Sequence, residues 1–381
     1  MPAKRKGASN ANSQLPLRIE DSEQSAALVC RGIFSLNYLQ QHFATSEGFP
    51  TLEEAGPIYE RLKKRWLEDY VGMSRRKEAY TRTQFLDPLL KEIGWTFIPE
   101  QDLPSTGAMR KRPDYCLFLD DETRQRAAKE TDTADVFREA ETVLEAKKVQ
   151  HSLDEVSEVE TPGWFPSQQV QNYLHNAKDR TGRRYFNWAI LTNGNEWRLY
   201  CEQAPTDAFF AFHLASDQEF CSLEDFRLFL ALFRPQSFAR DEERLCLLDK
   251  LREESLTSQA QLESNLRKRI FDVLEDLADG FRDYQANKIT KQDFPALYDT
   301  SLIFLYRLLF VLYAESRGLL PVKPSGYGSN KRYREKFSLA HLVKDLRDKN
   351  SFASEAFTEL YEDLLKLFRL INGDKPEQNE E

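Results

Sequence analysis

Two short apolar runs, residues 114–119 and 142–148, carry the charged residues that constrain this chain most. The first run begins with Asp114, and the second contains Glu145 and Lys147. Both runs are rich in β-forming residues and are bounded by polar stretches, so each is predicted to be a strand. Side chains alternate along a strand, which puts Glu145 and Lys147 on one face. If the strands pair, Asp114 and Glu145 can hold one hard cation, with Lys147 beside the water or phosphate that the cation activates.

The two predicted strands are too far apart in the sequence for a tight hairpin. Asp114 and Glu145 are separated by 31 positions (145 − 114), and residues 120–141 fill the gap with charged side chains. An insertion between the strands is therefore expected. The alternative interpretation is that Asp114 caps a strand and that Glu145 and Lys147 lie on a solvated surface.

A helix is predicted upstream of the strands. Residues 76–95 place apolar side chains at helical spacing and include a glycine stop near the end. Pro88 should kink this helix or mark a junction between two helical pieces, because its ring clashes with the preceding turn. The helix offers Glu78 and Glu92 as further acidic residues, although either could be an ordinary surface glutamate.

A second helix and a hairpin are predicted downstream. Residues 164–174 open a helix on which Gln169 and Tyr173, four positions apart, share one face. An amide can bind phosphate or a base edge, and a tyrosine can stack or donate a hydrogen bond, so both suit a DNA-facing helix. The alternative is that Tyr173 packs in the core and Gln169 is exposed. Further along, Asn193-Gly194 between two apolar runs is a strong hairpin signal.

These motifs together resemble the PD-(D/E)xK nuclease superfamily. The Pro-Asp pair at 113–114 and the Glu-Ala-Lys triplet at 145–147 match its signature, and Gln-x-x-x-Tyr at 169–173 resembles an element of Type I restriction subunits. The resemblance implies a magnesium-dependent DNA endonuclease, in which Mn²⁺ should substitute for Mg²⁺. It implies Asp114 and Glu145 as metal ligands, Lys147 and Glu78 as further catalytic residues, and Gln169 and Tyr173 as DNA-binding residues.

The resemblance extends over nearly the whole chain. Residues 33–39, 191–200 and 305–321 look like the amino-terminal nuclease region and helical connector of Type IIG restriction-modification enzymes. The sequence contains no Asn-Pro-Pro-Tyr motif and no glycine-rich adenosylmethionine loop. The expected partners are therefore double-stranded DNA and a separate methyltransferase or specificity subunit, or else a second copy of the chain, in a restriction or anti-phage defence system.

The expected fold class is α/β, a mixed-sheet restriction-endonuclease-like core followed by an all-α domain. Within the all-α part, residues 302–312 are apolar enough to be a buried helix. Glu315 and Arg317 could form an interface ion pair, or could cap a helix or close a core. The predicted divisions are a disordered basic arm (1–20), a helical lead-in (21–59), a nuclease domain (60–221), a helical connector or docking domain (222–371) and an acidic tail (372–381).

The net charge of −9 is unfavourable for binding DNA, because neutralisation of the phosphates by basic side chains normally supplies much of the affinity. Residues 120–160 hold 13 acidic and 6 basic residues, a local balance of −7, so the rest of the chain is nearly neutral. Cations also stand close to the predicted site, at Arg110, Arg112 and Lys148. We expect the chain alone to bind DNA weakly and a partner to improve the affinity.

Composition favours a cytoplasmic protein of 381 residues with two or three domains. Five scattered cysteines without a Cys-x-x-Cys pair argue against a disulfide framework and a zinc site. We expect no apolar run to reach the length of a membrane span, and residues 1–13 lack the apolar core of a signal peptide. Two other functions stay open: a non-catalytic DNA-binding or assembly subunit, and a nuclease that acts on RNA or on DNA ends.

Overall fold

The computed structural model describes residues 28–100, 103, 112–156, 163–217, 219–322, 330–349 and 359–373. The chain divides between Leu262 and Glu263 into two units. We call residues 22–262 the sheet unit and residues 263–381 the helical unit, and each is described by itself. The predicted basic arm and nearly all of the predicted acidic tail lie outside the described residues.

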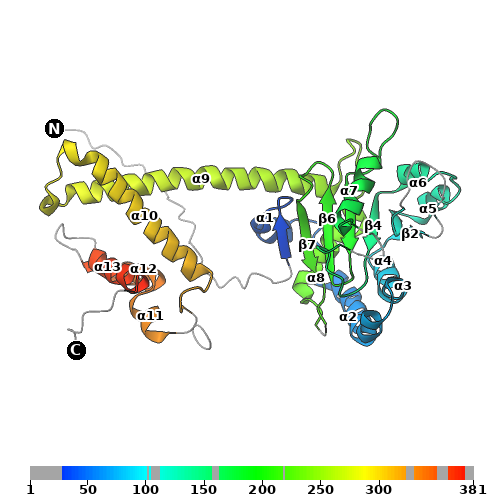
Figure 1. The fold of residues 1–381 in the computed structure, drawn as a ribbon, viewed down its shortest axis with the longest axis horizontal. Helices are drawn as coiled ribbons and strands as arrows, with labels where there is room; N and C mark the ends of the chain where they lie inside the picture. Colours follow the sequence, from blue (N-terminus) through cyan, green and yellow to red (C-terminus); the bar gives the residue numbers. More distant parts are fainter. Residues whose placement is uncertain are drawn as a thin grey trace, which may run out of the picture. The chain divides into compact units, whose positions relative to one another are not determined.

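Seven strands form one mixed sheet in the sheet unit (Figure 1). Their order across the sheet is β1-β7-β6-β5-β4-β3-β2; β4 and β5 run parallel, and the other neighbouring pairs run antiparallel. The predicted α/β core is thus present as a seven-stranded sheet with helices. The strands are β1 (Leu28–Arg31), β2 (Thr96–Pro99), β3 (Tyr115–Phe118), β4 (Thr142–Ala146), β5 (Trp188–Thr192), β6 (Glu196–Cys201) and β7 (Phe209–His213).

One face of the sheet packs against a layer of helices that lie before β2 and after β7 in the sequence. Trp197 of β6 contacts Phe229 and Phe233 edge to face, with ring centroids 5.3 and 5.6 Å apart, and these rings belong to one large apolar cluster. Burial of each such ring stabilises the fold by about 1.5–3 kcal/mol. The helices in this layer are α1 (Leu36–Gln41), α2 (Leu52–Arg75), α4 (Asp87–Glu92), α8 (Leu223–Phe233) and the start of α9 (Leu247–Asp283).

The other face of the sheet packs against helices inserted between its strands. Val136 and Phe137 of one helix and Val170 and Leu174 of another join strand residues in a second apolar cluster. The charged segment between β3 and β4 therefore forms two short helices whose apolar residues reach the sheet. The helices on this side are α5 (Asp121–Ala127), α6 (Thr133–Glu139) and α7 (Pro166–Asn176).

The pairing of β3 with β4 confirms the predicted strand pair. Tyr115 lies opposite Leu144 and Cys116 lies opposite Val143. Continuing this antiparallel register by one position sets Asp114 opposite Glu145. Opposite residues in an antiparallel pair have Cβ atoms about 4.5–5.5 Å apart, so the register itself brings the two acids together.

The helix predicted over residues 76–95 has a junction just before Pro88, as expected. It consists of α3 (Glu78–Thr81), a π-helical turn (Arg82–Leu86) and α4, with Pro88 in the first turn of α4. The helix is continuous here, because the Asp87 N–H bonds to the Arg82 carbonyl, and the irregular π-helical turn lies just before the residue whose ring and missing N–H disturb regular α-helical bonding. The Tyr115 hydroxyl donates a 2.6 Å hydrogen bond to Asp87, which ties α4 to β3.

The predicted hairpin is also confirmed. Strands β5 and β6 pair antiparallel on either side of Asn193 and Gly194, and Gly194 has a positive φ of 88°. The Asn193 side-chain oxygen accepts hydrogen bonds from the N–H groups of Asn195 and Glu196, 3.0 and 2.8 Å away. Both features are typical of a turn built from asparagine and glycine.

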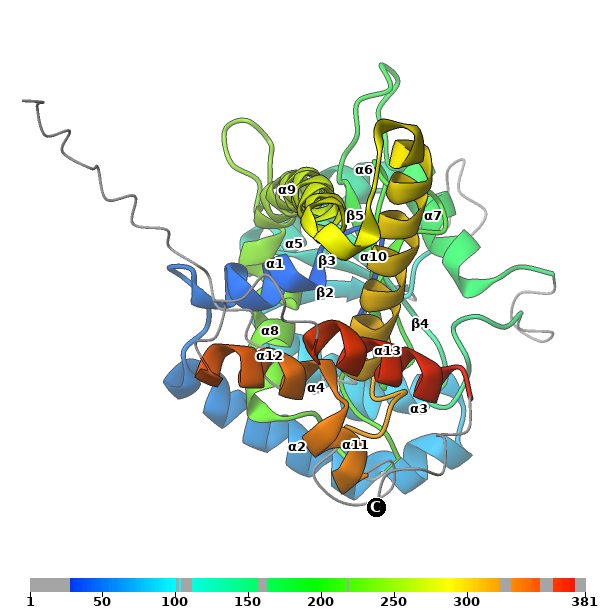
Figure 2. The same ribbon diagram turned by 90° about the vertical axis from the view of Figure 1, so that its left-hand side faces the viewer.

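The helical unit contains the remainder of α9, followed by α10 (Phe294–Ser316), α11 (Lys331–Lys336), α12 (Leu339–Lys349) and α13 (Glu359–Ile371). The last three helices lie together (Figure 2). The Glu315 carboxylate accepts the Tyr333 hydroxyl at 2.8 Å and the Leu339 N–H at 3.0 Å, so it links α10 to the beginning of α12. Glu315 thus has the core-closing and capping role. The residues of the small core are Val311, Tyr333, Leu339, Leu342 and Leu367.

Two predicted boundaries of the sheet unit were wrong. The division expected at residues 221/222 lies at 262/263, because α8 packs its phenylalanines on the sheet instead of joining the later helices. The lead-in over residues 21–59, expected to be helical, contains β1, which pairs with β7 at the edge of the sheet. Sequence periodicity identifies an apolar face but does not say what it will pack against.

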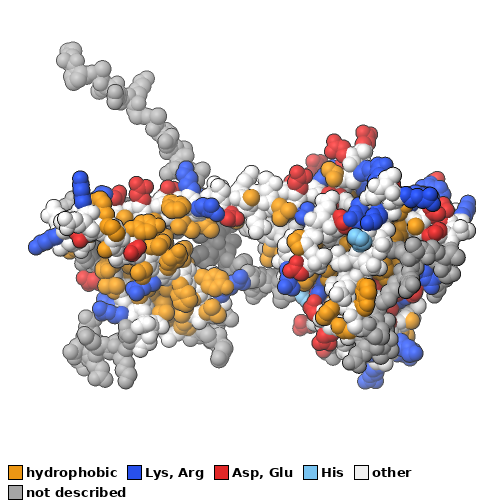
Figure 3. All heavy atoms as spheres, turned by 45° about the horizontal axis from the view of Figure 1, so that its top comes forward, with side chains coloured by type: hydrophobic (Ala, Val, Ile, Leu, Met, Phe, Trp, Pro, Cys, Tyr) orange, Lys and Arg blue, Asp and Glu red, His pale blue; other side chains and the backbone are white. Residues whose placement is uncertain are grey.

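The predicted helix over 302–312 is present within α10, but it is buried on one side only, where Phe304, Leu305 and Val311 lie. Ile303, Tyr306 and Phe310 are each more than half exposed, and hydrophobic side chains gather on the helical unit in the view of Figure 3. Residues 291–316 are long and apolar enough to cross a membrane by length and composition alone, although core helices of soluble proteins pass the same test. The expectation that no apolar run reaches this length was therefore wrong.

Candidate active site

Asp114 is fixed at the start of β3 by contacts from three directions. One carboxylate oxygen accepts the backbone N–H of Ala146 at 2.7 Å, and the other forms an ion pair with Arg82. The backbone carbonyl of Asp114 accepts the N–H of Glu100 at 2.8 Å, next to β2. The side chain is buried, and its bond to the Ala146 N–H at the end of β4 is the kind of contact that the strand-capping alternative expected of Asp114.

Glu145 and Lys147 form a buried pair on the same strand edge. Lys147 Nζ donates to Glu145 Oε1 at 2.7 Å, and the Tyr173 hydroxyl lies 3.0 Å from Glu145 Oε2. The backbone N–H of Lys147 donates to the carbonyl of Thr192 at 2.7 Å, which continues the parallel pairing of β4 with β5. Both side chains are about 95% buried or more, so the alternative of a solvated face is wrong.

The two carboxylates of the site lie beside two cationic side chains, Arg82 and Lys147. Burial, and then the nearby charge of Glu145, raise the pKa of Asp114 to about 7, although Arg82 and the Ala146 N–H act in the opposite direction. Burial by itself would lower the pKa of Lys147, but the charge and hydrogen bond of Glu145, together with the charges of Asp114 and Glu78, outweigh it, and the pKa is raised. Burial and the Glu145 charge also raise the pKa of Tyr173, so its hydroxyl stays protonated. Two close carboxylates in a buried site repel each other unless positive charge joins them.

The helical segment before β2 contributes Arg82 to the site. Arg82 contacts Asp114, whereas Glu78 contacts Arg82. Arg82 also lies over the Tyr115 ring, 4.9 Å from its centroid. Glu78 lies 3.9 Å from the Arg82 guanidinium, and its charge raises the pKa of Lys147, so Glu78 is close to the site. Glu92 instead pairs with Arg61 of α2 at 2.7 Å.

Gln169 and Tyr173 both lie on the buried face of α7, only 5% and 1% exposed. Tyr173 bridges two parts of the site, because its hydroxyl is 3.0 Å from Glu145 and 3.0 Å from the carbonyl of Arg112. The side-chain oxygen of Gln169 is buried without a hydrogen-bond partner among the described residues. Contact of either side chain with DNA stays a prediction, and of the two only Tyr173 contacts Glu145.

The donor set fits a small hard cation such as magnesium. Asp114 and Glu145 offer carboxylate oxygens from adjacent strands. Within the described part of the chain, no group of three or more His, Cys, Asp or Glu side chains is arranged to hold a metal. Magnesium commonly uses only one or two carboxylates and keeps several waters or substrate oxygens, so two acids are enough.

Several parts of the site were not predicted from the sequence. Arg82 stands four residues after Glu78 on the same helical face, and that spacing was the available signal. The Ala146 N–H and the Arg112 carbonyl could not be predicted, because backbone groups are present at every position and the sequence does not distinguish them. No family model, curated protein or solved structure matches this chain.

Proposed function

We propose that the chain is a magnesium-dependent DNA endonuclease of the PD-(D/E)xK type. The observation that carries the proposal is the convergence of Asp114 and Glu145, from adjacent strands, beside the buried ammonium of Lys147. Two carboxylates that hold a metal ion, with a lysine beside it, would supply what metal-assisted phosphodiester hydrolysis requires. The sequence resemblance supports the same conclusion and adds a restriction or anti-phage defence setting with a separate methyltransferase or specificity subunit.

Each residue of the site has a role in this proposal. Asp114 and Glu145 would hold the cation, which would supply Lewis-acid chemistry at the scissile phosphate. Lys147 holds its proton and is placed to stabilise negative charge on the phosphate or to orient the attacking water. Tyr173 donates to Glu145 or to the Arg112 carbonyl, and so limits the positions that the Glu145 carboxylate can take.

The contact of Arg82 with Asp114 favours a second candidate function. Arg82 supplies the positive charge that a metal would supply in the nuclease proposal. If this ion pair is permanent, Asp114 is not available to a cation, and the chain would be a non-catalytic DNA-binding or assembly subunit with a nuclease-like fold. Under the nuclease proposal, Arg82 must release Asp114 when metal binds and can then face the substrate phosphate.

A pair of measurements separates the two candidates. Supercoiled plasmid is incubated with the full chain in the presence of Mg²⁺, Mn²⁺ or EDTA, and metal binding is followed by calorimetry on the same preparation. The nuclease proposal requires nicking that depends on the metal, together with binding that is lost in Glu145→Gln. Absence of both metal binding and nicking would leave the non-catalytic candidate. A matched assay on single-stranded RNA and on linear DNA tests the remaining alternative substrates.

A further inference from the structure

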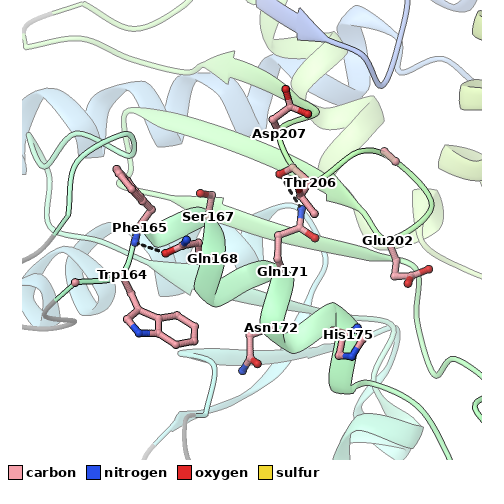
Figure 4. Close-up of a pocket in the computed structure, with 12 residues that line it drawn as sticks. Trp164, Phe165, Ser167, Gln168, Gln171, Asn172, His175, Glu202, Thr206 and Asp207 are labelled. Atoms are coloured by element: carbon pink, nitrogen blue, oxygen red, sulfur yellow. Dashed lines mark hydrogen bonds between the residues drawn. The ribbon is translucent and has the colours of Figure 1, made fainter.

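A groove of about 840 Å³ lies along the outer side of α7 (Figure 4). Gln168, Gln171, Asn172 and His175 line it, and their spacing of three and four residues makes them one stripe of the helix. The buried residues of α7, including Tyr173, form the opposite stripe. The same helix therefore has one face in the candidate active site and the other in this groove.

Two large aromatic side chains stand at the amino end of the groove (Figure 4). Trp164 is 43% exposed and Phe165 is 42% exposed. The other four tryptophans of the chain are buried, each at most 2% exposed. Aromatic rings held at the surface next to a groove are suitable platforms for stacking with a planar ligand.

The polar groups of the groove suit the edge of a base. Gln168 uses its side-chain oxygen to accept the Phe165 N–H at 3.0 Å, and within the described chain its amide nitrogen has no protein acceptor. Asp207, on the loop between β6 and β7, adds an exposed carboxylate, whereas Glu202 is paired with Arg184. Amides can pair with adenine, and carboxylates can accept from the amino group of cytosine.

The charge of the groove argues against phosphate as its ligand. None of the described residues that line it is Lys or Arg, and two are acidic. We propose that the groove binds an unpaired nucleobase of a nucleic-acid strand, with the base stacked on Trp164 or Phe165. This inference rests on the proposed nuclease function, because that function supplies the nucleic acid.

The test measures binding without cleavage. The full chain in EDTA is titrated with a fluorescently labelled single-stranded oligonucleotide, an abasic oligonucleotide of the same length, and free adenosine or cytidine. Anisotropy gives the affinity, and tryptophan quenching reports Trp164, since the other tryptophans are buried. We expect the base-containing oligonucleotide to bind and to quench the fluorescence of Trp164. Trp164→Ala should weaken the binding by about tenfold to a hundredfold, because stacking contributes about 1–3 kcal/mol per base.

Matched variants and ligands decide the outcome. Trp164→Phe should retain most of the affinity, and Phe271→Ala, which removes an exposed ring of α9, should retain all of it. Equal binding of the abasic strand, or unchanged affinity in Trp164→Ala, would overturn the proposal. Binding of free nucleosides without binding of the oligonucleotide would show that the ligand of the groove is not a base within a nucleic-acid strand. Because no metal is present, a chain that binds bases but never cleaves DNA would contradict the nuclease function and leave the groove assignment standing.

Discussion

The Asp114 carboxylate accepts the backbone N–H of Ala146 at 2.7 Å, so the first acid of the site is bonded to the strand that carries the second. This bond crosses from the start of β3 to the end of β4, where the strand pairing stops. It holds the Asp114 side chain beside Glu145 before any ligand binds. A change at Asp114 consequently affects both the chemistry of the site and the local structure, and tests of the site must measure both.

The carboxylates should be essential for cleavage. Asp114→Ala and Glu145→Ala should abolish nicking, because each removes a charged ligand, and Lys147→Ala should lower the rate by a factor that corresponds to about 2.7–4 kcal/mol. Plasmid nicking measures the rates, and thermal unfolding checks the fold. Asp121→Ala, on exposed α5, is the matched control. Wild-type rates in all three site variants would refute the assignment.

The α7 residues should affect cleavage more than metal binding. Tyr173→Phe removes a hydroxyl that lies within hydrogen-bond distance of Glu145, and a hydrogen bond to a charged group contributes about 1.5–3 kcal/mol. We expect a tenfold to hundredfold loss of cleavage in Tyr173→Phe and a smaller loss in Gln169→Ala, with a smaller change in calorimetric affinity for Mn²⁺, because the Glu145 carboxylate keeps its bond to Lys147. Gln125→Ala on α5 is the control. A parallel loss of metal affinity would show that Tyr173 acts only by holding Glu145.

The metal-free protein should lose stability as the pH rises. The pKa of Asp114 is raised to about 7, above its unfolded value of about 3.9, so the folded state binds the proton more tightly. The contribution to the free energy of unfolding is therefore complete below about pH 4 and is lost as the pH rises toward 7, by at most about 1.4 kcal/mol per pH unit. Urea unfolding followed by tryptophan fluorescence measures it, since all five tryptophans belong to the sheet unit. Asp114→Asn should flatten this dependence, and an unchanged slope would contradict the prediction.

The helical unit should depend on Glu315. Glu315→Ala leaves the Tyr333 hydroxyl and the Leu339 N–H without their acceptor, which should cost about 1–3 kcal/mol. Hydrogen exchange in α10 to α12 should speed up, while exchange in the sheet unit stays unchanged. Glu335→Ala, at an exposed position, is the control. If the amide protons of α12 were protected in Glu315→Ala as they are in the wild type, the Glu315 contacts would not contribute to the stability of the helical unit.

The isolated chain should bind DNA poorly and lack sequence specificity. Its net charge is −9, and the proposed function leaves sequence recognition to a separate subunit. Anisotropy at physiological salt should show weak binding, and a cleavage assay should give nicks without a preferred site. Sedimentation under the same conditions gives the oligomeric state. Sequence-specific double-strand breaks by the monomer would contradict this prediction.

Local patterns were enough to predict the elements that carry the acids. The β-forming runs at β3 and β4 and the apolar spacing of α7 depend on neighbours in the sequence, as does the Asn193-Gly194 turn. Alternation along β4 then put Glu145 and Lys147 together. These features were predictable because each arises from interactions over a few residues.

Contacts between distant segments decided the rest. The sequence by itself determined the α/β order, the two acids with their lysine, and the helix that carries Tyr173. Only the tertiary structure decided that Arg82 pairs with Asp114, that Glu92 turns to Arg61, and that α8 packs on the sheet. An apolar stripe can pack against many other surfaces, and a charged side chain can pair with many opposite charges. The choice among them depends on which surfaces the folded chain brings together, and that information is not local.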